Sequence, residues 1–229
     1  MQNIILRAVR FFCRKIILKD LKRQYNEILT HLREQNVFIM DEREYYKFYK
    51  SSKLKGAIII LRHDVDRNLK NIKVIKQIEK RNKVRSTLHL RAKERTYKLK
   101  ELKSLDLRGF DIALHLESSS LDEIKKDKMS LEKTVKRKII GASIHGGYYP
   151  GKNISKKKIL QNLKKAGFKY ITFFNKGNYP IKKYGMLLIP YRISDLEIVQ
   201  SGYKEFMRQL NDIIKRNGCS SLNTHSEYF

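Results

Sequence analysis

The sequence predicts an α/β protein: an irregular parallel (β/α) barrel of about seven strands, preceded by a helical extension. Short apolar runs alternate with longer amphipathic segments along most of the chain, a pattern typical of repeated βα units around a parallel sheet. Several apolar runs end abruptly in polar residues, and such residues at the carboxyl ends of parallel strands indicate a ligand-binding edge. The length of 229 residues suits one domain of barrel size.

The clearest change of polarity lies in segment 56–66, Gly-Ala-Ile-Ile-Ile-Leu-Arg-His-Asp-Val-Asp. Its five apolar residues are too few for a free-standing helix and do not alternate with polar ones, so they predict a strand buried on both faces. At the expected end of that strand stand four polar residues, Arg62, His63, Asp64 and Asp66. Two carboxylates beside a histidine can hold a cation and leave one carboxylate as a base. A helix cap is the alternative, with Asp66 or Asn68 capping the next helix and Asp64 paired with Arg62.

The remaining elements follow from the same patterns. Strands are predicted at 57–61, 84–90, 110–114, 139–144, 168–174, 186–189 and 221–224. Helices are predicted between them at 69–82, 99–107, 121–135, 155–166 and 202–216. Two further helices, 18–35 and 41–49, precede the first strand. We therefore expect an N-terminal helical extension over residues 1–50 and a barrel domain over residues 51–229.

The composition is strongly basic, with 51 Lys and Arg against 23 Asp and Glu and a net charge of +28. An excess of this size favours anionic partners such as nucleic acid, an acidic glycan or an anionic membrane face. The excess is mostly Lys spread over every predicted helix, which is typical of solvated outer faces and argues against a dedicated nucleic-acid groove. The cysteines are Cys13 and Cys219, so neither a disulfide framework nor a thiolate zinc site is indicated. We expect a cytoplasmic protein, with membrane association as the alternative.

The first 18 residues mix apolar side chains with Arg and Lys. No run in the sequence approaches the roughly 20 apolar residues of a membrane span. The apolar stretch is also broken too often for the core of a signal peptide. Two interpretations remain: a first helix packed on the domain, or a basic amphipathic helix in peripheral contact with an anionic membrane.

Five of the six histidines fall at or near the ends of predicted strands: His63, His89, His115, His145 and His225. The same rim is expected to carry four carboxylates, Asp64, Asp66, Glu117 and Asp195. A single histidine is more often a hydrogen-bonded structural residue than a ligand. The set as a whole indicates a metal site, because neutral imidazole and carboxylate are what Zn²⁺, Fe²⁺, Mn²⁺ or Co²⁺ accept without thiolates.

Five motifs, in order and spacing, carry a family resemblance. They are Leu-Arg-His-Asp-Val-Asp66, Phe-Asp-Ile-Ala-Leu-His115-Leu-Glu, Ser-Ile-His145-Gly, Tyr-Arg-Ile-Ser-Asp195 and Leu-Asn-Thr-His225. From Gly56 to the C-terminus the chain resembles the polysaccharide deacetylases of carbohydrate esterase family four, in the subgroup whose first motif is Arg-His-Asp-x-Asp. The resemblance implies a deacetylase-like barrel of parallel strands with helices outside. It also implies hydrolysis of N- or O-linked acetyl groups on glycans with one divalent metal.

The resemblance also implies catalytic roles. Asp64 matches the catalytic base, and His225 matches the histidine that protonates the leaving group. Asp195 matches the aspartate that orients this acid. Water attacking an acetamide carbonyl would lose a proton to Asp64, and His225 would protonate the departing amine.

For the metal, the resemblance implies Asp66 and His115 as ligands. The family usually has a second metal histidine four residues after the first, and Ser119 occupies that position here. Glu117 and His145 are the two candidate substitutes. Substrate contacts are expected from four further residues, Arg62, His63, Gly146 and Tyr148.

These observations together predict a hydrolase that acts on carbon–nitrogen bonds other than peptide bonds and removes acetyl groups from a saccharide, such as a cell envelope glycan precursor. The expected cofactor is one divalent metal, zinc in the first place, with iron, manganese or cobalt as alternatives. A catalytically impaired saccharide-binding relative of the same fold is one alternative, because of Ser119. A basic nucleic-acid or membrane-surface binding protein is another, because of the net charge.

Overall fold

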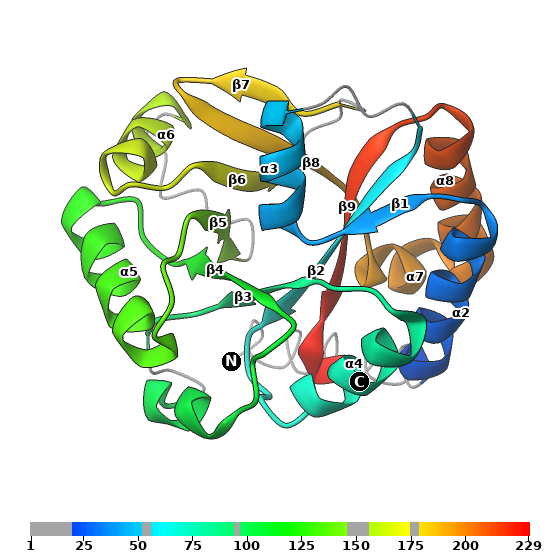
Figure 1. The fold of residues 1–229 in the computed structure, drawn as a ribbon, viewed down its shortest axis with the longest axis horizontal. Coiled ribbons are helices and arrows are strands. Elements are labelled where there is room, and N and C mark those ends of the chain that lie inside the picture. Colours follow the sequence, from blue (N-terminus) through cyan, green and yellow to red (C-terminus); the bar gives the residue numbers. More distant parts are fainter. Residues whose placement is uncertain (1–19, 52–55, 94–96, 146–155, 175–178) are drawn as a thin grey trace, which may run out of the picture.

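Seven parallel strands close into one barrel in the computed structural model, which describes residues 20–51, 56–93, 97–145, 156–174 and 179–229 (Figure 1). Its strands are, in order around the barrel, β2 (Ile58–Val65), β3 (Thr87–Leu90), β4 (Asp111–Leu116), β5 (Gly141–Ile144), β6 (Tyr170–Phe174), β8 (Met186–Ser194) and β9 (Cys219–His225). The barrel is closed because β9 pairs with both β8 and β2. The predicted fold class is thereby confirmed, and each of the seven predicted strands has a counterpart.

Helices cover the outside of the barrel (Figure 1). One side carries α2 (Leu21–Glu34), α4 (Ile72–Asn82), α7 (Asp195–Ser201) and α8 (Tyr203–Lys215), and the other carries α5 (Leu121–Val135) and α6 (Lys156–Lys165). The outward side chains Ile59 and Leu61 of β2 pack against apolar faces of these helices, for example at Leu29 and Phe206. Where a helix was predicted over 99–107, the chain forms a shorter 3-10 helix, η1 (Leu99–Ser104), and a second one, η3 (Ser226–Tyr228), follows β9.

The segment before the first predicted strand contributes a strand to the sheet as well as helices. β1 (Phe38–Met40) pairs in parallel with the first residues of β2, and α3 (Glu42–Ser51) follows it across the amino-terminal end of the barrel (Figure 1). The backbone N–H of Glu42 donates to Thr87 Oγ1 at 2.9 Å, and Arg43 Nε donates to Asp111 Oδ1 at 2.6 Å. Thr87 and Asp111 are the first residues of their strands, so α3 closes the end of the barrel where the strands begin. The domain boundary at residue 50 stays a prediction.

β2 is longer than its apolar run predicted. We expected the strand to stop before the polar residues, but it continues through Arg62, His63 and Asp64 to Val65. Successive side chains of a strand point to opposite faces. Arg62 and Asp64 therefore point into the barrel and His63 points outward. Each of these polar side chains has a buried hydrogen-bond partner. The strand therefore continues past the point where the sequence changes from apolar to polar residues.

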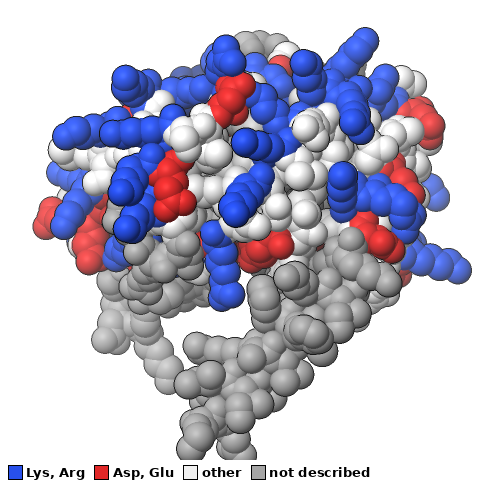
Figure 2. Space-filling view, turned by 90° about the horizontal axis from the view of Figure 1, so that it is seen from below, with Lys and Arg blue, Asp and Glu red and all other residues white. Residues whose placement is uncertain are grey.

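The basic charge is dispersed on the face shown in Figure 2, where Lys and Arg lie over much of the described surface with Asp and Glu between them. At the barrel's outer edge, β7 (Ile181–Lys183) pairs antiparallel with β8. In the described part of the chain, no helix has the length and apolarity needed to cross a membrane. The two interpretations of the first 18 residues concern a segment outside the described residues.

Candidate metal and catalytic site

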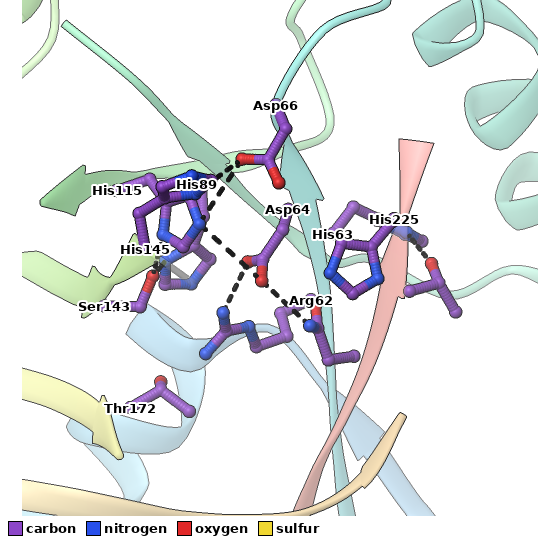
Figure 3. Close-up of polar contacts among 12 residues, drawn as sticks. Arg62, His63, Asp64, Asp66, His89, His115, Ser143, His145, Thr172 and His225 are labelled. Atoms are coloured by element: carbon purple, nitrogen blue, oxygen red, sulfur yellow. Dashed lines mark hydrogen bonds and ion pairs between the residues drawn. The ribbon is translucent and has the colours of Figure 1, made fainter. Parts of the chain in front are cut away.

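Polar side chains from β2, β3, β4, β5 and β9 meet inside the barrel, close to the ends where those strands finish (Figure 3). The register of the parallel sheet explains how they meet. Asp64 on β2 has His89 on β3 as its direct neighbour on one side and His225 on β9 as its neighbour on the other. Further round, His115 on β4 lies beside Ser143 on β5. Residues far apart in the sequence thus share one level of the barrel interior.

The carboxylate of Asp64 is held on both oxygens. Arg62 donates from Nη2 to Oδ1, and Asn223 Nδ2 donates to Oδ2 at 2.8 Å. Burial acts to raise the pKa of Asp64, but the positive charges of Arg62 and of His225 oppose burial and help to hold this pKa well below its ordinary value. Asp64 is therefore an ionised, oriented carboxylate at neutral pH, and Oδ2 lies 3.8 Å from His115 Nε2.

Asp66, His115 and His145 form a group suited to a metal ion, which we name the metal trio. Asp66 Oδ1 lies 3.5 Å from His115 Nε2 and 3.1 Å from His145 Nδ1. Two atoms bound tetrahedrally to one zinc ion at about 2.0 to 2.1 Å lie roughly 3.3 Å apart. Burial lowers the pKa of His115 to about 3, so its imidazole is neutral, as a metal ligand must be.

A second group, Asp64 with His89 and His115, is also close enough to hold an ion. Its donor atoms have other partners, however. One ring nitrogen of His89, Nδ1, lies 2.6 Å from Ser143 Oγ, and the other, Nε2, lies 2.9 Å from Glu42 Oε1. Both oxygens of Asp64 accept hydrogen bonds as well. The metal trio is the better match, because Asp66 Oδ1 lies 3.5 Å from His115 Nε2 and 3.1 Å from His145 Nδ1, whereas both ring nitrogens of His89 are held by Ser143 and Glu42.

His225 lies on the opposite side of Asp64 from His89, His115 and His145 (Figure 3), and it forms a tight pair with Asp195. Asp195 Oδ1 lies 2.7 Å from His225 Nδ1, and Oδ2 accepts the backbone N–H of His225 at 2.7 Å. Asp195 is the first residue of α7, whose start is fixed by a capping box between Ser194 and Glu197. Burial acts to lower the pKa of His225, but the negative charge of Asp195 outweighs it and raises this pKa to about 10.

His63 does not lie in the site, contrary to the expectation that it contacts substrate. Its side chain points to the outer side of β2 and is completely buried. Nε2 lies 2.7 Å from Glu79 Oε1, and Nδ1 lies 2.5 Å from Thr224 Oγ1. Since the neighbouring Asp64 faces the interior, the alternation of a strand forces His63 outward, where it contacts helices and no substrate can reach it.

Arg62 and Glu117 also differ from their expected roles. Arg62 points into the barrel but is only 3% exposed, and it holds Asp64 where we expected it to contact substrate. Glu117 accepts from Arg91 Nη2 and belongs to neither metal-binding group found among the described residues. Of the two candidate third ligands, the structure therefore places His145 in the metal trio. Gly146 and Tyr148 lie outside the described residues.

Four residues of the site were not anticipated from the sequence: Glu42, Ser143, Thr172 and Asn223. Ser143 and Asn223 could have been found, since each stands two residues before a rim histidine on its strand and so shares its face. Glu42 gave no such signal, because it belongs to a helix in the segment that we treated as an extension. Its carboxylate reaches the barrel interior only because α3 lies across the barrel end.

Solved structures with a similar fold carry deacetylase names. The Streptococcus pyogenes deacetylase PplD, in complex with acetate, matches with a TM-score of 0.54 and 17% identity, over 79% of this chain and 86% of its own. A Bordetella bronchiseptica protein assigned as a polysaccharide deacetylase involved in O-antigen biosynthesis matches with a TM-score of 0.50 and 14% identity, over 75% and 72%. The fold is that of the polysaccharide deacetylases.

The deacetylase fold also occurs in a CE4 family pseudoenzyme from Bacillus anthracis, which matches with a TM-score of 0.51 and 13% identity over 76% of this chain and 58% of its own. No family model and no curated protein matches the sequence. With sequence identities of 17% or less, these solved structures show that the fold is shared and nothing more. Because active and inactive proteins share that fold, activity has to be argued from the site.

Proposed function

We propose that this protein is a metal-dependent hydrolase that removes N- or O-linked acetyl groups from a saccharide. The observation that carries the proposal is the convergence of three kinds of group around one space: the carboxylate of Asp64, the metal trio, and the His225–Asp195 pair. The deacetylase fold supports the same reaction class, and the structure of PplD was obtained in complex with acetate.

The donor set of the metal trio, one carboxylate and two imidazoles, suits zinc and also iron, manganese or cobalt. When bound, such a divalent cation supplies Lewis-acid activation of water and of the acyl carbonyl. Both histidines and the carboxylate lie at the rim where the strands end, and the trio provides three protein ligands. Catalytic zinc sites commonly have three protein ligands and keep one position open for water or substrate.

The protein's own residues handle the protons. Asp64 accepts a proton from the water that attacks the acetyl carbonyl, and its ionised state at neutral pH suits that role. His225, protonated because of Asp195, donates a proton to the amine nitrogen as the carbon–nitrogen bond breaks. The products are acetate and a free amino sugar. With an O-acetyl substrate the same proton goes to the leaving alcohol.

Replacing Asp195 with Asn should shift the alkaline limb of the pH–rate profile. In the native protein the pKa of His225 is about 10, so its acid form persists through mildly alkaline pH. Without the carboxylate of Asp195, nothing of comparable size opposes the effect of burial, and the pKa of His225 should fall to the ordinary histidine value of about 6.5 or below. We expect kcat/KM of Asp195→Asn to decline from about neutral pH upward, in a pH series of acetate release. An Asp212→Asn variant, at the surface of α8, is the control. An unshifted limb in Asp195→Asn would rule out His225 as the acid.

Metal analysis combined with acetate release tests the proposal. We expect the purified chain to bind about one divalent ion and to release acetate from a panel of N- and O-acetylated sugars. Asp66→Ala and His145→Ala should weaken zinc binding by roughly 100-fold or more, because each removes a proposed ligand. Glu117→Gln is the matched control and should bind zinc within a few-fold of the native affinity.

Two outcomes would contradict the proposal in different ways. A native chain that binds no divalent ion above trace and releases no acetate would exclude a metal-dependent hydrolase. A chain that binds metal and saccharide but releases no acetate would instead be a binding relative of the same fold, as Ser119 suggested. Loss of zinc in Glu117→Gln but not in His145→Ala would assign the third ligand to Glu117.

A further inference from the structure

A chain of hydrogen bonds connects the far end of the barrel to the metal trio. Glu42 Oε1 lies 2.9 Å from His89 Nε2, and His89 Nδ1 lies 2.6 Å from Ser143 Oγ. The same hydroxyl lies 2.7 Å from His115 Nδ1. Four side chains from α3, β3, β5 and β4 thus form one continuous series, which we name the interior relay, and it ends on the nitrogen of His115 that does not face Asp66.

The interior relay is shielded from solvent along its whole length. Its members are between 0% and 2% exposed, so water cannot replace a missing partner. Thr172 Oγ1 also donates to Oε1 of Glu42, which gives that oxygen two donors. Each ring nitrogen of His89 has a protein partner, as does Nδ1 of His115. A closed series of this kind restricts where each hydrogen can be, because every donor must meet an acceptor.

The order of donors follows from the carboxylate end. Oε1 of Glu42 already receives the hydroxyl of Thr172 and so acts as an acceptor, and His89 donates to it from Nε2. A neutral His89 then has its lone pair on Nδ1, and the hydroxyl hydrogen of Ser143 goes to that lone pair. The oxygen of Ser143 must in turn accept from Nδ1–H of His115. This leaves the lone pair of His115 on Nε2, the atom that faces the rest of the metal trio.

The geometry around His115 Nε2 agrees with this order. A hydrogen on Nε2 would be expected to reach a carboxylate at hydrogen-bond distance. The nearest oxygens, Asp66 Oδ1 at 3.5 Å and Asp64 Oδ2 at 3.8 Å, are both farther away than a normal hydrogen bond. A lone pair that faces two carboxylate oxygens is the arrangement in which His115 could bind a metal ion together with a carboxylate.

We propose that Glu42 is a positioning residue for the metal trio: acting through His89 and Ser143, it holds His115 in the tautomer with hydrogen on Nδ1 and so prepares Nε2 to bind the ion. The role of Glu42 in metal binding rests on the proposed function. The tautomer of His115, however, is a property of the metal-free chain. It also gives the segment before residue 51 a part in the site. Outer partners of metal-binding histidines fix the tautomer in the same physical way.

Ring nitrogen NMR of the full chain tests the proposal directly. Long-range ¹H–¹⁵N spectra report which nitrogen of His115 carries hydrogen, first without metal and then with zinc, and a competition titration gives the zinc affinity. We expect the Nδ1–H tautomer in the native chain. Ser143→Ala and Glu42→Leu should move His115 toward the Nε2–H form and weaken zinc binding by roughly 10- to 100-fold.

Two matched variants separate this role from a packing effect. Glu42→Gln keeps a carbonyl oxygen that can accept from His89, so it should retain the native tautomer and bind zinc within about threefold of the native affinity. Ser220→Ala removes another fully buried serine hydroxyl, one that donates to the backbone of Ser221, and should change neither readout. If Glu42→Leu does not fold, Ser143→Ala carries the comparison.

The outcomes distinguish this inference from the proposed function. An Nε2–H tautomer in the native metal-free chain would overturn the inference. So would an unchanged tautomer and zinc affinity in Ser143→Ala together with folded Glu42→Leu. A native Nδ1–H tautomer that responds to these variants supports control by Glu42 even if the chain releases no acetate, in which case only the proposed hydrolysis fails.

Discussion

Asp64→Asn should reduce the rate of acetate release by roughly 10²- to 10⁴-fold, the usual contribution of a general base. The amide cannot accept the proton of the attacking water. Its carbonyl oxygen can still accept from Arg62, so we expect a folded chain. Zinc affinity should stay within a few-fold, because Asp64 is not a member of the metal trio. The measurement is kcat for acetate release beside a zinc titration and a thermal melt.

The matched control for this variant is Asp111→Asn. Asp111 is also a buried barrel aspartate, paired with Arg43 and with the hydroxyl of Tyr170, but it lies at the opposite end of the barrel. The Asp111→Asn variant should lose stability because an ion pair is disrupted in the same way. Its rate of acetate release per folded molecule should stay at the native value. Equal rate losses in both variants would show that the Asp64→Asn effect is structural and that Asp64 is not the base.

A chain that begins at residue 51 should not fold into the barrel. The removed segment contains α2, whose buried apolar side chains are Leu21, Tyr25, Ile28, Leu29 and Leu32, and it also contains β1 and the end-covering α3. Burial of five such side chains at about 1.5 to 3 kcal/mol each amounts to roughly 7 to 15 kcal/mol, an upper estimate. A whole domain is stable by only about 5 to 15 kcal/mol. Circular dichroism melts and the dispersion of NMR signals, measured for the full chain and for the chain that begins at residue 51, show whether each chain is folded.

Point substitutions in α2 give a finer version of the same test. Leu29→Ala, in the core against β2, should cost about 2 to 5 kcal/mol of unfolding free energy. Lys22→Ala, exposed on the same helix, should stay within about 0.5 kcal/mol of the native value. A cooperative transition in the chain that begins at residue 51 would contradict the prediction and would support a self-sufficient barrel domain after residue 50.

Local patterns carried most of the fold prediction. The apolar spacing of 121–135 predicts α5 with its observed bounds, because helical periodicity is a property of neighbouring residues. The strand at 57–61 was predicted too short for the same reason. Its continuation through Asp64 depends on partners such as Asn223, which are distant in the sequence and contribute nothing to a local pattern.

The amino-acid sequence by itself determined the alternation of strands and helices and placed histidines and carboxylates at the strand ends, since both depend on residues a few positions apart. Only the tertiary structure decided which of two adjacent residues, His63 or Asp64, faces the site, because that depends on how β2 registers with β3 and β9. It likewise decided that His145 and not Glu117 joins the metal trio, and that Glu42 enters the barrel from a helix outside the family motifs. The physical reason is that closing a barrel brings separate strand ends within a few ångströms of one another, and no local periodicity encodes those distances.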